Sequence, residues 1–96
     1  MSVLLYERYP VDPVRSREFE HAANELLSAL RKAPGALWAE LSRAVDGDQT
    51  YLLIAEWRTE ADADAWAASG PAVEFMRAVD VLLGAEITRR RFVSPA

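Results

Sequence analysis

The sequence predicts an α+β fold, in which one four-stranded antiparallel sheet carries helices on one face, in the order β-α-β-β-α-β. Three observations predict it. An amphipathic helix over residues 13–33 lies between two strand-like runs, and a strand, a helical region and another strand follow. A short Asp-Gly-Asp turn joins the two middle strands. The run over residues 50–59 is apolar on both faces, whereas a half-solvated strand alternates apolar and polar residues.

Length and composition exclude several classes of partner and of metal site. The 96 residues predict a single domain over residues 1–96. The net charge of −4 gives no attraction to nucleic acid or an anionic membrane, and the absence of cysteine excludes disulfides and thiolate metal sites. His21 is the one histidine, so one subunit has no multi-histidine metal site. We see no signal peptide and no apolar run of the roughly 18 residues that a membrane span needs, and we expect a cytoplasmic protein.

The first half of the chain predicts a strand, a helix and a second strand. Residues 2–9 form the first strand, with Val3, Leu5, Glu7 and Tyr9 on one face. Asp12-Pro13 marks the start of a helix that Pro34-Gly35 ends. The apolar stripe of this helix faces away from His21 and consists of Phe19, Ala22, Ala23, Leu26, Leu27 and Leu30.

The second half repeats this order after a hairpin. Residues 36–45 form the second strand, 46–49 the turn and 50–57 the third strand. Thr59 is placed to cap a helix that runs to about Ala68. Ser69-Gly70-Pro71 separates it from a third helix that ends near Gly84. The last strand, residues 86–93, carries three consecutive arginines on alternate sides, a pattern typical of a charged edge strand.

This element order is that of a ferredoxin-like sandwich. Right-handed crossovers place both helical layers on one face of the sheet, which leaves the other face bare. Because the first and third strands are apolar on both faces, a bare face would be a large exposed apolar patch. The same face of a second copy is the simplest cover, so the pattern predicts a two-fold homodimer.

Several short motifs resemble the antibiotic biosynthesis monooxygenase family. They are Ala33-Pro34-Gly35 after the helix, Leu41-Ser42-Arg43, Asp46 and Asp48, and the run from Tyr51 to Trp57 before an acidic, Ala-rich helix. The resemblance implies a dimeric α+β barrel with a substrate cavity between each sheet and its own helices. Members include cofactor-independent oxygenases that convert polycyclic anthrones or quinols to quinones, and others degrade haem.

The family's functional residues match this chain in part. Trp57 matches the tryptophan that closes the third strand, and Arg77 matches an arginine of the polyketide oxygenases. Their strand asparagine is Leu53 here, and an asparagine of the first strand is Glu7. The helical tryptophan of the haem-degrading branch matches Trp66, but its haem-ligating histidine, a strong axial ligand, falls at Met76.

Each candidate residue has a functional and a packing interpretation. Trp57 and Trp66 are either walls of a cavity or core aromatics, and Trp38 either packs or lies in the dimer interface. The resemblance implies that Glu7 faces the cavity, where it is a candidate general base. Otherwise it pairs with an arginine such as Arg77 or lies at the solvated end of the strand. Arg77 itself can hold a phenolate or lie at the surface. Together these interpretations predict catalytic residues Trp57, Glu7 and Arg77, and substrate-binding residues Tyr51, Leu53, Trp66 and Met76.

The main hypothesis is a cofactor-independent monooxygenase that uses O₂ to oxidise a small aromatic, polyketide-type phenol, anthrone or quinol, with no metal or other cofactor. Such an enzyme needs little more than a dry pocket, help with proton removal and support for the resulting anion. The alternatives are a non-catalytic ligand-binding or stress-related barrel, and a cyclase or isomerase that needs only an acid–base group such as Glu7.

Overall fold

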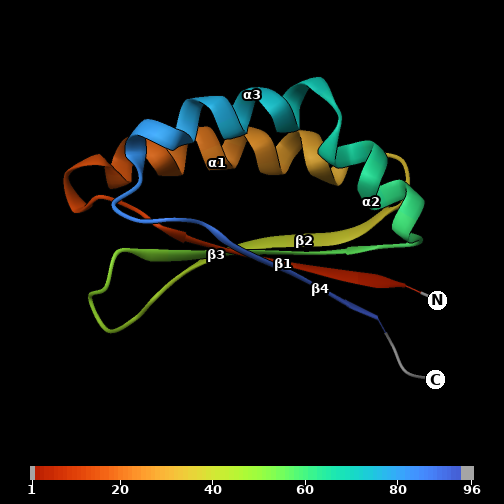
Figure 1. Ribbon diagram of the computed structural model, residues 1–96, viewed down its shortest axis with the longest axis horizontal. Helices are drawn as coiled ribbons and strands as arrows, with labels where there is room; N and C mark the ends of the chain where they lie inside the picture. The colour runs from red at the N-terminus through yellow and green to blue at the C-terminus, as the bar shows by residue number, and fades with distance from the viewer. Residues whose placement is uncertain (1, 94–96) are drawn as a thin grey trace.

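Four antiparallel strands form one sheet, and the helices cover one of its two faces (Figure 1). The structure is a computed structural model and describes residues 2–93; residue 1 and residues 94–96 of the predicted domain lie outside it. The strand order is β2-β3-β1-β4. The fold is therefore the predicted ferredoxin-like α+β sandwich. Its elements are β1 (Val3–Pro10), η1 (Pro13–Arg15), α1 (Ser16–Arg31), β2 (Ala36–Arg43), β3 (Thr50–Trp57), α2 (Glu60–Ala67), α3 (Gly70–Val79), η2 (Asp80–Leu82) and β4 (Thr88–Val93).

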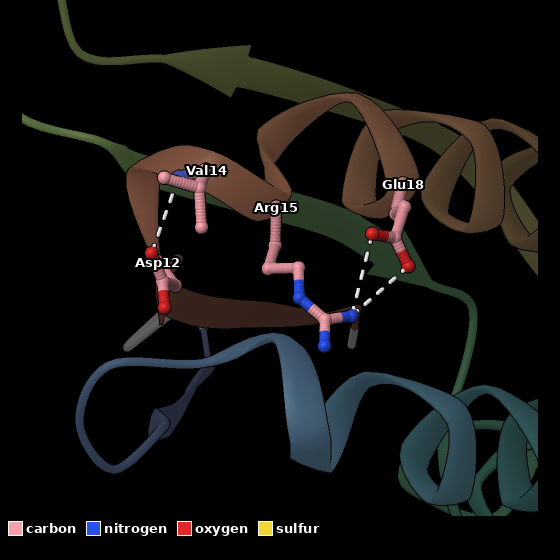
Figure 2. A network of polar contacts seen from close by, with 4 residues as sticks. All are labelled: Asp12, Val14, Arg15 and Glu18. Carbon is pink, nitrogen blue, oxygen red and sulfur yellow. Dashed lines mark hydrogen bonds and ion pairs between the residues drawn. The ribbon is translucent and has the colours of Figure 1, made fainter.

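The first long helix begins where the sequence places it, but its first turn is a 3₁₀ helix. The Asp12 carboxylate accepts a hydrogen bond from the Val14 N–H (Figure 2). Pro13 is the first residue of this turn, where no N–H donor is needed. Arg15 then pairs with Glu18 one turn later, at 3.1 Å. The helix ends at Arg31, and Gly35 adopts a φ of +85° in the turn that follows.

The central strand β3 has the two environments that its sequence predicts. Tyr51, Leu53, Ala55 and Trp57 are buried under the helices, and the residues between them are half-buried on the opposite face. β3 pairs with β1 on one side and with β2 on the other. Trp38 pairs with Glu56 on the helix-free face, next to the buried Ala39, and its indole N–H donates to the Glu56 carboxylate at 2.7 Å. The β2–β3 register is irregular between Ala36 and Trp38.

Aromatic rings fill the core between α1, α3 and the sheet. Phe19 of α1 is fully buried and packs against Tyr51, with ring centroids 4.8 Å apart, and against Tyr9 at 5.4 Å. Phe75 of α3 joins them at 6.2 Å from Phe19. Tilted and edge-on arrangements of this kind stabilise a core beyond area burial alone.

The helix-free face of the sheet has an apolar centre, with Arg8, Glu56 and Arg90 on the same face around it. Its apolar part consists of the half-buried residues Leu4, Tyr6, Leu52 and Ile54 with the exposed residues Trp38 and Phe92. No helix of the described chain covers this face (Figure 1).

Several predicted boundaries are wrong by a few residues. β2 ends at Arg43 and not Val45, β4 begins at Thr88 and not Glu86, and the third helix changes to 3₁₀ after Val79. Ends of elements depend on local backbone hydrogen bonds, which periodicity does not report. Within residues 2–93, no helix combines the length and the apolar character required to cross a bilayer.

Candidate functional site

A cavity of about 400 Å³ opens between the sheet and the helices α1, α2 and α3, a volume typical of small-molecule sites. We call it the sheet–helix cavity. Most of its wall is apolar, and its titratable groups come from β1 and β4. It is lined by Leu5, Glu7, Tyr9, Leu26, Trp66, Ala67, Ala72, Phe75, Met76, Arg89, Arg90 and Arg91.

A carboxylate, a phenol and a guanidinium meet on the sheet side of this cavity. Tyr9 donates a hydrogen bond to one Glu7 oxygen at 3.0 Å, and Arg89 Nε donates to the other at 2.8 Å. Glu7 and Tyr9 are two residues apart on one strand, so they share a face, and β1–β4 pairing places Arg89 directly opposite Glu7. Each Glu7 oxygen thus accepts one hydrogen bond, and a carboxylate has further lone pairs on both oxygens.

Burial and the neighbouring Glu7 carboxylate raise the pKa of Tyr9 well above its usual range. Burial, with the hydrogen bond that Tyr51 donates to Glu20, raises the pKa of Tyr51 as well. Both phenols therefore stay protonated through the neutral range, and Tyr9 is a permanent donor to Glu7.

These shifts predict that the protein loses stability in alkali. An unfolded tyrosine ionises near pH 10, whereas the folded Tyr9 and Tyr51 hold their protons to higher pH. Because only the unfolded state then releases protons, the free energy of unfolding falls as pH rises above about 10. Tyr9→Phe removes one of the two groups, so its urea-unfolding free energy is expected to fall less steeply between about pH 9 and pH 11. An equal or steeper fall in this variant would contradict the assignment.

Three of the predicted site residues line the cavity and the others do not. Glu7, Trp66 and Met76 are part of its wall. Tyr51 and Leu53 are buried in the core, 2% and 4% exposed. Trp57 is fully buried behind Trp66, with ring centroids 6.1 Å apart, and its indole N–H has no hydrogen-bond partner within the described residues.

Arg77 lies outside the cavity wall, exposed on α3. The arginine that pairs with Glu7 is Arg89 of β4, which the sequence pattern assigned to a charged edge strand. β4 is an edge strand of the sheet, as the pattern predicted. The prediction did not include that one face of this strand lines the cavity.

Sequence reasoning missed Tyr9, Arg89 and Arg91 as cavity residues. The signal for Tyr9 was present, since it shares a strand face with Glu7. The alternation of the arginine run also places Arg89 and Arg91 on one face. Only the strand register shows that this face is the one that carries Glu7.

Comparisons with known proteins agree with this fold. The model of the protein family antibiotic biosynthesis monooxygenase matches residues 2–78 of this chain. The haem oxygenase (mycobilin-producing) of Mycobacterium tuberculosis is 33% identical over 61 residues, which cover 64% of this chain and 53% of that enzyme. The chain thus spans about half the length of the curated relatives that it matches.

Two solved structures show the same fold. A mutant of SnoaB, a cofactor-independent oxygenase from Streptomyces nogalater, has a TM-score of 0.87 at 21% identity, with 99% of this chain and 94% of that chain covered. A protein of Mycobacterium tuberculosis has a TM-score of 0.93 at 16% identity, with 100% and 97% covered.

The cavity is a poor match to haem. Its wall contains no histidine, and His21 lies on the outer side of α1, with its side chain 80% exposed beside Glu25. The sulfur of Met76 is already in contact with Arg89. The residues present therefore do not supply the proximal histidine common among haem proteins.

The family match covers more than half of the chain, and the solved structures share its fold. The chain belongs to the antibiotic biosynthesis monooxygenase family.

Proposed function

We propose that this protein is a cofactor-independent monooxygenase that oxidises a fused-ring aromatic phenol, anthrone or quinol of the polyketide type. The observation that carries the proposal is the Glu7–Tyr9 pair at the base of an apolar, aromatic-walled cavity. Family membership and the oxygenase names of two similar proteins support it.

The proposed reaction starts with a proton transfer to Glu7. An anthrone has an acidic methylene, and its anion is electron-rich enough to reduce O₂ directly. One C–O bond forms, and protonated Glu7 gives its proton to the peroxide. Glu7 then removes the second methylene hydrogen as the O–O bond breaks, and the departing hydroxide takes that proton. One oxygen atom ends in the quinone and the other in water, so no external reductant is required.

Other residues of the site would position the rings and exclude water. Trp66, Phe75 and Met76 supply flat or adaptable apolar walls. Trp57 supports Trp66 from behind, with the two rings inclined by 30°. We assign Tyr51 and Leu53 to the core beneath the site and give Arg77 no contact with the substrate, because each lies outside the cavity wall.

Oxygen uptake with a hydroxylated anthrone tests the proposal. The protein, treated with a chelator and free of added cofactors, is expected to consume one O₂ per anthrone and to release the quinone faster than buffer does. Uptake no faster than the buffer blank would contradict it.

A cyclase or isomerase remains the second candidate, because a carboxylate beside a protonated phenol is an acid–base pair that needs no O₂. Product formation from an anthrone without O₂, together with no uptake in air, would favour it over the oxygenase. A ligand-binding protein without activity would bind the same compounds and change none of them.

We also propose that the protein is a homodimer through the helix-free face. Leu4, Tyr6, Leu52 and Ile54 form an apolar strip across the two central strands of this face. The same strip on a second copy gives the self-complementary contact that a two-fold dimer requires.

Ile54→Lys is expected to convert this dimer to a monomer, because it places a charge in the middle of the strip. Analytical ultracentrifugation at micromolar concentration measures the change. Val81→Lys, at a position 70% exposed in η2, serves as the matched control and is expected to stay dimeric. A wild-type monomer under these conditions would rule out the proposed interface.

A further inference from the structure

The charge of the sheet–helix cavity is opposite in sign to the charge of the chain. The net charge of the protein is −4. The charged residues that line the cavity are three arginines, from β4, and one glutamate. Arg90 stacks over Phe92, with 5.0 Å between the guanidinium carbon and the ring centroid. Arg89 and Arg91 lie on the strand face that pairs with Glu7 and Leu5. The cavity is therefore locally cationic in an acidic protein.

The two arginines lie nearer to solvent than the carboxylate does. The Arg89 and Arg91 side chains are 50% and 37% exposed, whereas the Glu7 side chain is 17% exposed. The strand register places Arg89 opposite Glu7 and Arg91 opposite Leu5, so the two arginines follow one another along the same face of β4. The wall thus has a half-buried carboxylate and two cations nearer to solvent.

Neither guanidinium is saturated by its ion pair. Arg89 uses Nε for Glu7 and places Nη2 against the Met76 sulfur, which is a weak acceptor. Arg91 uses Nη1 for Asp64 at 2.7 Å, and that aspartate side chain is 63% exposed on α2. A guanidinium has five N–H donors in a planar fork, so both arginines keep donors for a carboxylate of a ligand.

From this arrangement we infer that the ligand of the sheet–helix cavity is an aromatic anion, a fused-ring compound that carries a carboxylate held by Arg89 and Arg91. The apolar wall formed by Trp66, Phe75 and Leu26 holds the rings, and the ring carbon that reacts lies toward Glu7. The inference rests on the proposed function in taking this cavity as the substrate site. Beyond the proposed function, the inference states that the substrate carries a carboxylate and that Arg89 and Arg91 select it.

A matched pair of fluorescent probes tests the inference by binding alone. Anthracene-2-carboxylate and anthracene-2-carboxamide have the same shape and differ in charge. The wild-type protein is expected to bind the carboxylate at least about tenfold more tightly than the amide, since a charge-assisted bidentate contact is stronger than a neutral one. Added salt is expected to weaken carboxylate binding and to leave amide binding nearly unchanged.

Two variants that break the same ion pair are expected to act in opposite directions. Arg89→Gln removes the cation and lowers the preference for the carboxylate, whereas Glu7→Gln removes the competing anion and raises it. If the ion pair had only a structural role, both variants would change the preference for the carboxylate in the same direction. Arg17→Gln, an equal change of charge at an exposed position of α1, is the control and is expected to keep the wild-type preference.

Equal affinity for the two probes, tighter binding of the amide, no binding of either, or a parallel loss in both ion-pair variants would overturn the inference. Oxidation of an uncharged anthrone by the same preparation is measured separately. If the anthrone is oxidised but the carboxylate is not preferred, the inference fails and the proposed function stands. If the carboxylate is preferred but no anthrone is oxidised, the proposed function fails instead.

Discussion

Phe19→Ala is expected to destabilise the protein by about 3–5 kcal/mol, the range measured for deletion of a buried aromatic ring. Phe19 is fully buried and is the only ring that contacts Tyr9, Tyr51 and Phe75 together among the described aromatic pairs. Its loss leaves a cavity between α1 and the sheet that rigid strands cannot close. Urea unfolding, followed by circular dichroism, measures the change.

Val14→Ala is the control for this prediction, because its side chain is 85% exposed in η1. It is expected to change the free energy of unfolding by no more than about 0.5 kcal/mol. A loss below about 1 kcal/mol for Phe19→Ala would show that helix packing on the sheet contributes little to stability.

Glu7→Gln is expected to lower the rate of anthrone oxidation by about 10²–10⁴-fold, the usual contribution of a general base. The amide keeps the shape of the side chain and a hydrogen-bond acceptor for Tyr9, but it takes up no proton. Steady-state oxygen uptake at saturating anthrone measures the effect on kcat.

Glu74→Gln is the matched control, at an exposed glutamate of α3 outside the wall of the sheet–helix cavity. It is expected to keep the wild-type rate. A Glu7→Gln rate within about twofold of wild type would assign proton removal to another group or to solvent.

The sequence was sufficient to predict the fold because its local signals agree with one another. The periodicity of α1, the Asp12 cap, the turn at Gly47 and the acidic start of α2 each predict the same element order that the structure has. The prediction of an apolar helix-free face followed from two strands, β1 and β3, each of which carries apolar residues on both faces.

The site was predicted in part, because it depends on distances between strands that are far apart in the sequence. Glu7 and Trp66 were recognised by strand face and by family resemblance, and both line the cavity. Arg89 is 82 residues from Glu7, and its role depends on the β1–β4 register. Alternation within a strand cannot fix that register. Arg77 was selected because it matches an arginine of the polyketide oxygenases in the family resemblance, and the structure places it at the surface of α3.

Hydrogen exchange at the anthrone methylene tests the central claim most directly, because it follows proton removal without the later O₂ steps. In D₂O without O₂, the wild-type protein is expected to accelerate replacement of the methylene hydrogens by deuterium, followed by NMR, and Glu7→Gln is expected to lose most of that acceleration. Exchange at the buffer rate, or equal acceleration by the two proteins, would contradict the assignment of Glu7 as the base.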